Sequence, residues 1–217
     1  MLVDVSMLMD QPTLPEMVEV LTQRLAEERQ RRLKFYEEIT PDMKAEFING
    51  EVVMHSPALA KHTAARMRVT NLLNNYVDFK GLGLVHDEKS LCTFPRNDYE
   101  PDVVFFGPAK AATITPDTLQ FPPPDLVCEV LSPSTEKRDR GIKFQDYEAH
   151  GVGEYWLIDP DKEVLEQYLP GANGLYELRM KSGTGQVVSK VVPGFSIPVR
   201  AIFDAEVQRT TLRDLLG

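Results

Sequence analysis

A single glutamate interrupts the most apolar run of the sequence. Residues 126–131 read Leu-Val-Cys-Glu-Val-Leu, and a continuous apolar run of this length is typical of a strand buried on both faces. A buried carboxylate must become protonated or pair with a cation, because an isolated charge is too costly in an apolar interior. Glu129 is therefore predicted to face a cation. In the alternative interpretation the strand has one wet face, and Glu129 points to solvent.

Two further charged residues lie where they can meet Glu129. Asp102 directly precedes the apolar segment 103–106, which is predicted to be a strand. Lys143 lies in a helical segment that follows the strand of Glu129, and on a helix Asp139 and Lys143 share one face at i, i+4. In the alternative interpretation, Asp102 is a turn residue at a strand edge and Lys143 belongs to a solvated charged face.

Two carboxylates and a lysine are side chains that together can support metal-assisted phosphodiester hydrolysis. Mg²⁺ is usually held by one or two carboxylates and keeps several waters. Such an ion lowers the pKa of a bound water, and a nearby lysine can orient that water and stabilise the transition state. We therefore expect Asp102 and Glu129 to be ligands of Mg²⁺ (or Mn²⁺) and Lys143 to be a catalytic residue.

The hydrophobic patterns predict the elements that must position these residues. We expect an amphipathic helix at about 14–36, a hairpin of strands 45–48 and 51–54 around Asn49-Gly50, a helix at 57–79, strands at 103–106, 126–131 and 154–158, a helix at 135–150, a hairpin of strands 163–169 and 176–180, and a last strand at 187–192. This order predicts an α/β fold with a mixed sheet. The first helix is either a dimer arm or a helix packed on its own domain.

Composition and charge narrow the classes of function. The 217 residues suit one domain of ordinary size, or one domain with an added arm. A net charge of −9 excludes a general nucleic-acid coat, because phosphate affinity comes from lysine and arginine, but it does not exclude a local basic groove. The two cysteines, Cys92 and Cys128, exclude a disulfide framework and a zinc cage.

The sequence predicts neither a membrane protein nor a secreted one. It contains no run of about 18 apolar residues, so no transmembrane helix is expected. The first residues, Met1-Leu2-Val3-Asp4-Val5, carry an early aspartate and no basic segment, so no secretory signal is expected. The expected location is the cytoplasm.

Several local motifs occur together in this chain. They are Glu46-Phe47-Ile48-Asn49-Gly50-Glu51, Pro101-Asp102-Val103-Val104-Phe105, the run 124–135, and the run 151–160. In this combination the chain resembles the Uma-two family, a branch of the PD-(D/E)XK restriction-endonuclease-like superfamily. The resemblance covers roughly residues 41–217. It implies a restriction-endonuclease-like α/β core with a mixed central sheet flanked by helices, preceded by an N-terminal helical arm at 1–40 and followed by C-terminal hairpin strands.

The resemblance also implies roles for individual residues. Asp102 matches the aspartate of the PD motif, and Glu129 matches the acidic residue of the (D/E)XK motif. Leu131 stands where the superfamily pattern has its lysine. In branches of this kind the lysine moves to the following helix, where Lys143 is the match.

Further candidates surround this proposed centre. Glu46 resembles an auxiliary acidic residue that superfamily members contribute from their first helical region, and Glu51 is its competitor. The substrate-binding candidates are His62, Arg138, Arg140 and Tyr147. Their structural alternatives are a satisfied histidine, a solvated charged turn for the two arginines, and a core aromatic.

The leading hypothesis is a metal-dependent endonuclease that hydrolyses DNA with Mg²⁺-activated water. The alternative is a catalytically weak or inactive nuclease-fold module that binds nucleic acid or protein partners, which the displaced lysine and the acidic charge favour. A third hypothesis is an assembly component in which the arm pairs subunits. A homodimer is expected from the arm and the resemblance.

Overall fold

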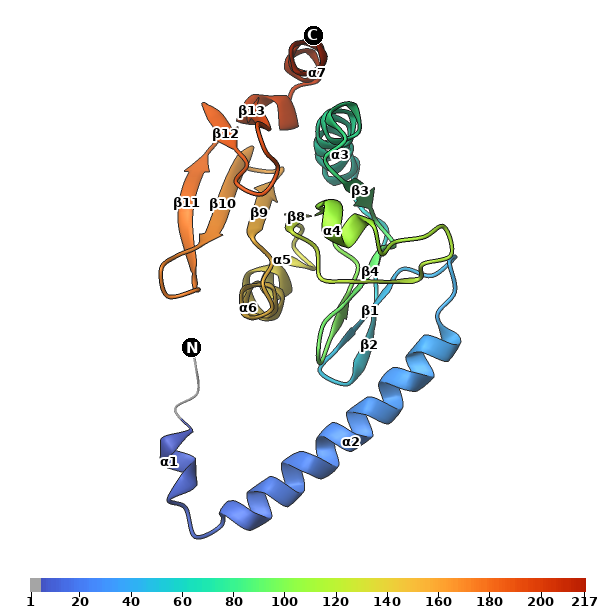
Figure 1. Cartoon of the computed structure of the whole chain (residues 1–217), viewed down its shortest axis with the longest axis vertical. Coiled ribbons are helices and arrows are strands. Elements are labelled where there is room, and N and C mark those ends of the chain that lie inside the picture. The colour runs from blue at the N-terminus through green and yellow to red at the C-terminus, as the bar shows by residue number, and fades with distance from the viewer. Residues whose placement is uncertain (1–4) are drawn as a thin grey trace.

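The computed structural model describes residues 5–217, and its elements alternate between helices and short strands (Figure 1). The helices are α1 (Ser6–Met9), α2 (Leu14–Glu38), α3 (Ala60–Lys80), α4 (Pro108–Ala111), α5 (Glu136–Arg138), the π-helical turn η1 (Asp139–Lys143), α6 (Phe144–Ala149), the 3-10 turn η2 (Val199–Ile202) and α7 (Ala205–Leu216). Residues 1–4, on which the prediction of no secretory signal partly rests, lie outside the described residues.

The strands are short, as expected for a sequence rich in turn signals. They are β1 (Ala45–Ile48), β2 (Glu51–Met54), β3 (Leu84–Asp87), β4 (Leu91–Thr93), β5 (Asp98–Tyr99), β6 (Val103–Phe106), β7 (Gln120–Phe121), β8 (Leu126–Val130), β9 (Glu154–Asp159), β10 (Val164–Pro170), β11 (Tyr176–Ser182), β12 (Gln186–Val188) and β13 (Ser196–Pro198). Among the described residues they form sheets of six, five and two strands.

The six-stranded sheet has the order β11-β10-β9-β8-β6-β3 and is mixed, because β8 lies parallel to β9 and antiparallel to β6. Side chains of a strand alternate between its two faces. Cys128 and Val130 pack in the core that contains residues of α3, whereas Val127 and Leu131 pack in the core that contains Tyr147 of α6. Figure 1 shows α3 and α6 on opposite sides of β8. Glu129 therefore lies on the α6 side.

The five-stranded sheet has the order β2-β1-β5-β4-β7 and begins with the predicted hairpin. Asn49 and Gly50 have φ of 51° and 88°, the two positive values that a tight hairpin turn requires. On one face of β1, Phe47 packs against Phe35 of α2. Glu46 and Ile48 face the other side, and Ile48 joins the core that contains Tyr147. This alternation brings Glu46 toward β8 and α6.

The helix predicted at 135–150 forms with a local distortion. The turn Asp139–Lys143 is π-helical, between the α-helical α5 and α6. A π-turn accommodates an additional residue per turn, and such turns occur frequently at functional sites. The distortion changes the direction in which the following side chains leave the helix.

The last predicted strand, 187–192, is wrong beyond residue 188. β12 ends at Val188 and pairs with β13. The backbone turns away because the buried carboxylate of Glu154 accepts hydrogen bonds from the N–H groups of Lys190 and Val191, at 2.7 and 3.2 Å, and from the hydroxyl of Ser189. These N–H groups are therefore not available for a strand ladder.

Helix α2 has two different halves. Its C-terminal half joins the domain through Phe35 and through Arg32, which binds the carboxylate of Asp98. Its N-terminal half extends along the lower side of the molecule in Figure 1 and exposes Val18 and Leu21. The division between an arm at 1–40 and a domain at 41–217 stays a prediction. From residue 5 onward, no helix has both the length and the apolar character needed to cross a membrane.

Candidate active site

Glu129 and Lys143 form a buried ion pair. Oε1 of Glu129 lies 2.9 Å from Nζ of Lys143 and accepts a hydrogen bond of 3.0 Å from the hydroxyl of Tyr147. Glu129 is 4% exposed and Lys143 is 2% exposed. The alternatives of a solvent-facing glutamate and a solvated lysine are therefore both wrong.

Lys143 is enclosed by three carboxylates. Besides Glu129, its Nζ lies 2.7 Å from Oε1 of Glu46 and 3.4 Å from Oδ1 of Asp139. Burial by itself would lower the pKa of Lys143, but the surrounding carboxylates raise it well above its ordinary value. The π-turn contributes both Asp139 and Lys143, so the distortion of the helix lies within the site itself.

Asp102 and Glu129 are joined through the backbone. The N–H of Val130 donates to Oδ2 of Asp102 at 2.8 Å, and the N–H of Asp102 donates to Oε2 of Glu129 at 3.4 Å. The antiparallel pairing of β6 with β8 produces this reciprocal arrangement. Nε2 of His62, on α3, lies 3.1 Å from Oδ2 of Asp102. The two predicted metal ligands are thus held side by side by the sheet.

The electrostatics of the two carboxyls differ. Burial would raise the pKa of Asp102, but the hydrogen bond and charge of His62 lower it below its ordinary value. The pKa of Glu129 is raised to about 8. Burial is the main cause, and the neighbouring carboxylates add to it, whereas the charge of Lys143 acts to lower the pKa. Asp102 therefore ionises more readily than Glu129.

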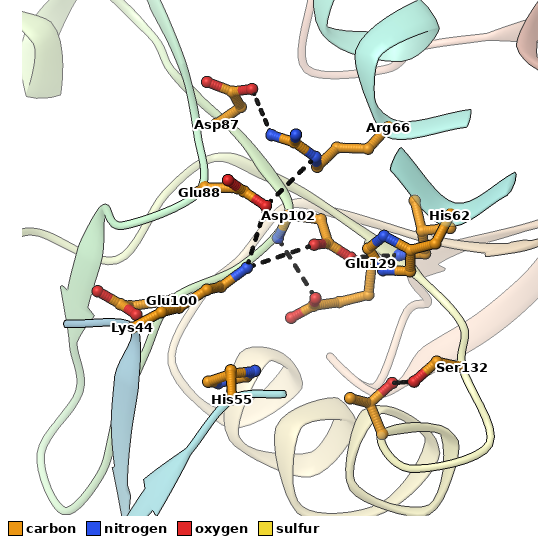
Figure 2. A network of polar contacts seen from close by, with 12 residues as sticks. Lys44, His55, His62, Arg66, Asp87, Glu88, Glu100, Asp102, Glu129 and Ser132 are labelled. Carbon is orange, nitrogen blue, oxygen red and sulfur yellow. Dashed lines mark hydrogen bonds and ion pairs between the residues drawn. The ribbon is translucent and has the colours of Figure 1, made fainter. Parts of the chain in front are cut away.

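These groups lie at a pocket of about 670 Å³. Figure 2 shows Asp102 between Lys44 and His62, with the carboxylate of Glu129 beside it. The pocket walls come from the segment 53–62, the turn at Glu88 and the segment 131–139.

A divalent cation of the Mg²⁺ type fits this donor set. Oδ1 of Asp102 has no hydrogen bond among the described residues, and its nearest cation is Nζ of Lys44 at 3.8 Å. Oε2 of Glu129 has only its long contact with the N–H of Asp102. Within residues 5–217 no group of three or more His, Cys, Asp or Glu side chains is arranged to hold a metal. Two carboxylates with room for waters suit Mg²⁺ or Mn²⁺, whereas zinc usually requires three or four protein ligands.

The structure does not bring every predicted residue to the pocket. Glu46 is part of the cluster, whereas its competitor Glu51 is exposed at the hairpin turn. Arg138 lines the pocket. Arg140 instead forms ion pairs with Glu166 and Glu136 and is absent from the pocket wall.

Tyr147, predicted as a substrate-binding residue, instead supports the carboxylate of Glu129 from inside the core. Its side chain is fully buried, and its hydroxyl supports Glu129. It therefore offers no exposed ring face on which a nucleic-acid base could stack.

Sequence reasoning missed several residues of the site. Lys44 and Glu100 line the pocket, and His55 lies 3.3 Å from the second carboxylate oxygen of Glu46. Lys44 and Glu46 are two residues apart at the start of a strand, so they share a face, and this spacing was a usable signal. Glu100 meets the site only through the pairing of strands that are distant in the sequence, whereas His55 reaches Glu46 across the predicted β1–β2 hairpin.

The family model Uma2, described as "Putative restriction endonuclease", matches residues 26–200. The chain belongs to the Uma2 family. Similar proteins include the uncharacterized protein slr1290 of Synechocystis, which is 26% identical over 167 residues that cover 74% of this chain and 83% of that protein. The predicted family is thereby confirmed.

A solved structure extends the comparison to the fold. The crystal structure of a "putative nuclease" of DUF820 from Anabaena variabilis matches with a TM-score of 0.67 and 21% identity. The match covers 82% of this Uma2 chain and 96% of the Anabaena chain. The predicted fold class, a mixed sheet flanked by helices, is thereby confirmed.

Proposed function

We propose that this Uma2 protein is a metal-dependent endonuclease that hydrolyses phosphodiester bonds of DNA. The observation that carries the proposal is the pairing of Asp102 with Glu129 at the pocket. Both carboxyls are buried, they come from neighbouring strands, and each is oriented by a backbone N–H of the opposite strand. The family description, restriction endonuclease, supports the same chemistry.

Mg²⁺ or Mn²⁺ is the proposed cofactor, held by Asp102 and Glu129. When bound, such an ion supplies a water of lowered pKa and positive charge for the phosphoryl oxygens. The choice of a cation is supported by the number of carboxylates in the cluster, since Glu46, Glu129 and Asp139 surround the single ammonium of Lys143.

The protein groups around the carboxylates have positioning roles. Lys143 holds Glu129 and Glu46 in place and offsets part of their charge. A lysine with a raised pKa keeps its proton at neutral pH, so Lys143 is not proposed as a general base. His62 and the N–H of Val130 engage Oδ2 of Asp102, which leaves Oδ1 available.

The proposed substrate is DNA, although the chain as a whole is acidic. The pocket wall carries Lys44, Lys61 and Arg138, which provide local positive charge beside the carboxylates. Phosphate binding depends on such local cations rather than on net charge.

The proposed assembly is a homodimer formed through α2. Val18, Leu21 and Leu25 are exposed and lie on one face of this helix at i, i+3, i+7. A second copy of the helix would cover them. The cytoplasmic location stays a prediction.

A plasmid assay tests the proposed activity. Supercoiled DNA incubated with the protein is expected to be nicked with Mg²⁺ or Mn²⁺ and to stay intact with EDTA. Glu129→Gln keeps the shape of the side chain but removes its charge, and it should abolish nicking. The matched control is Glu177→Gln, at an exposed glutamate of β11, which should cut as the unmodified protein does. Equal cutting by the Glu129→Gln protein would assign the activity to a contaminant and contradict the proposal.

A second candidate is a nuclease-fold module that binds nucleic acid or protein with weak or no catalysis. The burial of Lys143 among three carboxylates favours this candidate, because a side chain that is 2% exposed is not accessible to a substrate. This candidate predicts DNA binding without nicking, unchanged by EDTA.

A further inference from the structure

The two lysines nearest the paired carboxylates differ in what their ammonium groups can still bind. A lysine ammonium has three donors. Nζ of Lys143 lies within 3.4 Å of three carboxylate oxygens, donates a hydrogen bond to Glu129, and belongs to a side chain that is 2% exposed. Lys143 is therefore unable to contact a phosphate without giving up one of these partners.

Lys44 has the opposite properties. It directly precedes β1, lines the pocket, and its side chain is 22% exposed. Its Nζ lies 3.8 Å from Oδ1 of Asp102 and 3.6 Å from Oε1 of Glu88, and both separations exceed a hydrogen bond. The ammonium is thus attracted by two carboxylates but donates a hydrogen bond to neither.

Glu88, the second carboxylate beside Lys44, is itself held at the site. The N–H of Glu88 donates to the carbonyl of Asp102 at 3.2 Å, which ties the β3–β4 turn to the site. An oxygen of Glu88 also lies 3.5 Å from Nε of Arg66. This Nε atom is buried and has no hydrogen-bond partner among the described residues. Figure 2 shows Glu88 between the two cations. Glu88 therefore offsets the charge of Lys44 while leaving its donors open.

The other pocket lysine is less suitable. Lys61 is paired with Asp161 at the rim, and neither residue contacts Asp102 or Glu129. Among the lysines that line the pocket, Lys44 combines proximity to the carboxylates with unused donors.

We propose that Lys44, rather than Lys143, is the lysine that contacts the substrate, and that its ammonium binds a phosphate oxygen of the strand lying at Asp102 and Glu129. This inference rests on the proposed function, since it assumes a nucleic acid in the pocket. Lys143 then serves only to position the carboxylates. A polyanion must approach a floor of carboxylates here, and a cation with open donors at that point offsets their repulsion.

The salt dependence of DNA binding tests the inference. Binding of a fluorescein-labelled duplex is measured by anisotropy between 50 and 200 mM KCl, a range chosen so that counterion release is resolved. All proteins carry Glu129→Gln, so that the DNA stays intact. Lys44→Ala should reduce the slope of log K against log [salt] by about 0.9, the loss expected for one phosphate contact, and Lys44→Arg should retain the slope.

The matched control is Lys110→Ala. Lys110 is partly exposed like Lys44 (31% against 22%), but its ammonium pairs with Asp125 at 2.7 Å and it lies outside the pocket wall. An equal slope for Lys44→Ala and Lys110→Ala would overturn the inference. So would a slope that is lowered by Lys143→Met alone, because the phosphate would then belong to Lys143.

Cutting by proteins with Glu129 intact separates this inference from the proposed function. If the unmodified protein nicks plasmid and Lys44→Ala nicks it equally fast, the endonuclease stands and the role of Lys44 is wrong. If neither protein nicks but Lys44→Ala still lowers the slope, the phosphate contact stands and the endonuclease is wrong. Absence of salt-dependent DNA binding in the unmodified protein overturns both.

Discussion

Nζ of Lys143 lies 2.9 Å from Oε1 of Glu129, and the two residues come from a π-helical turn and a buried strand that only the short helix α5 separates in the chain. Neither side chain is accessible from solvent to any useful extent. We therefore expect the pair to contribute to the stability of the fold, so that removing Lys143 lowers the free energy of unfolding.

Lys143→Met is expected to reduce the free energy of unfolding by about 3–5 kcal/mol, because it leaves buried carboxylates without their cation. Adding Glu46→Gln to this variant removes one of those charges and should restore part of the loss. Urea unfolding measures the free energy of unfolding of the single variant and of the double variant. Lys110→Met, at a partly exposed ion pair, should cost less than about 1 kcal/mol. A Lys143→Met protein as stable as this control would contradict the buried cluster.

His62→Ala is expected to slow plasmid nicking by about 10- to 100-fold and to raise the Mg²⁺ concentration needed for half-maximal rate. The reason is that His62 orients Asp102, and partners of metal ligands typically have effects of this size. His150→Ala provides the control, since His150 is exposed and contacts Asp146 rather than the pocket carboxylates. An unchanged Mg²⁺ requirement in His62→Ala would show that Asp102 needs no support from this histidine.

Gly141→Ala is expected to raise the free energy of unfolding by about 0.4–1 kcal/mol, because alanine restricts the unfolded chain. A Cβ at this position of the π-turn would have no atom within 4 Å. Gly83→Ala is the contrasting variant: Gly83 has φ of 143°, and a Cβ there would collide with the carbonyl oxygen of Phe106. Thermal unfolding should show opposite shifts. A loss of stability in Gly141→Ala would indicate that the π-turn does not tolerate a side chain.

Arg140→Ala is expected to affect stability rather than DNA binding. Burial acts to raise the pKa of Glu166, but hydrogen bonds, first that of Arg140, lower it to about 2. A lowered carboxyl pKa stabilises the fold above the ordinary value of 4.5, and this contribution is lost as the pH falls toward 2. The stability difference between the unmodified protein and Arg140→Ala should therefore shrink between pH 6 and pH 3, measured by urea unfolding.

The same Arg140→Ala protein tests the earlier candidate role of this residue in substrate binding. Because Arg140 is held by Glu166 and Glu136 outside the pocket, DNA affinity at pH 7 should be unchanged. Weakened binding would return Arg140 to the set of substrate contacts.

Val18→Glu combined with Leu21→Glu is expected to convert a dimer to a monomer, because the two charges would be buried against a second α2. Light scattering should give twice 24.5 kDa for the unmodified protein and 24.5 kDa for the variant. Leu178→Glu, at an exposed position of β11, should leave the mass unchanged. A monomeric unmodified protein would exclude α2 as a dimer arm. Deletion of residues 1–36 is a less suitable test, since it also removes Arg32 and Phe35 from the domain.

Local sequence determined much of the fold. Asn49-Gly50 specified the hairpin because these residues tolerate positive φ, and the apolar run around Glu129 specified a strand buried on both faces. The same run implied that Glu129 faces a cation, since the cost of an unpaired buried charge is independent of the surrounding fold. The end of β12 was missed because a distant carboxylate, Glu154, captures the backbone N–H groups that would have continued the strand.

The sequence alone determined which side chains can be buried and which local turns can form, because these depend on solvation and backbone preferences that act over a few residues. The tertiary structure alone decided the partners. It brought Glu46 to Lys143, turned Arg140 toward Glu166, and left Lys44 with open donors beside Asp102. Such choices follow from strand order and from the direction in which a π-turn sends its side chains, and neither is encoded in the spacing of residues along the chain.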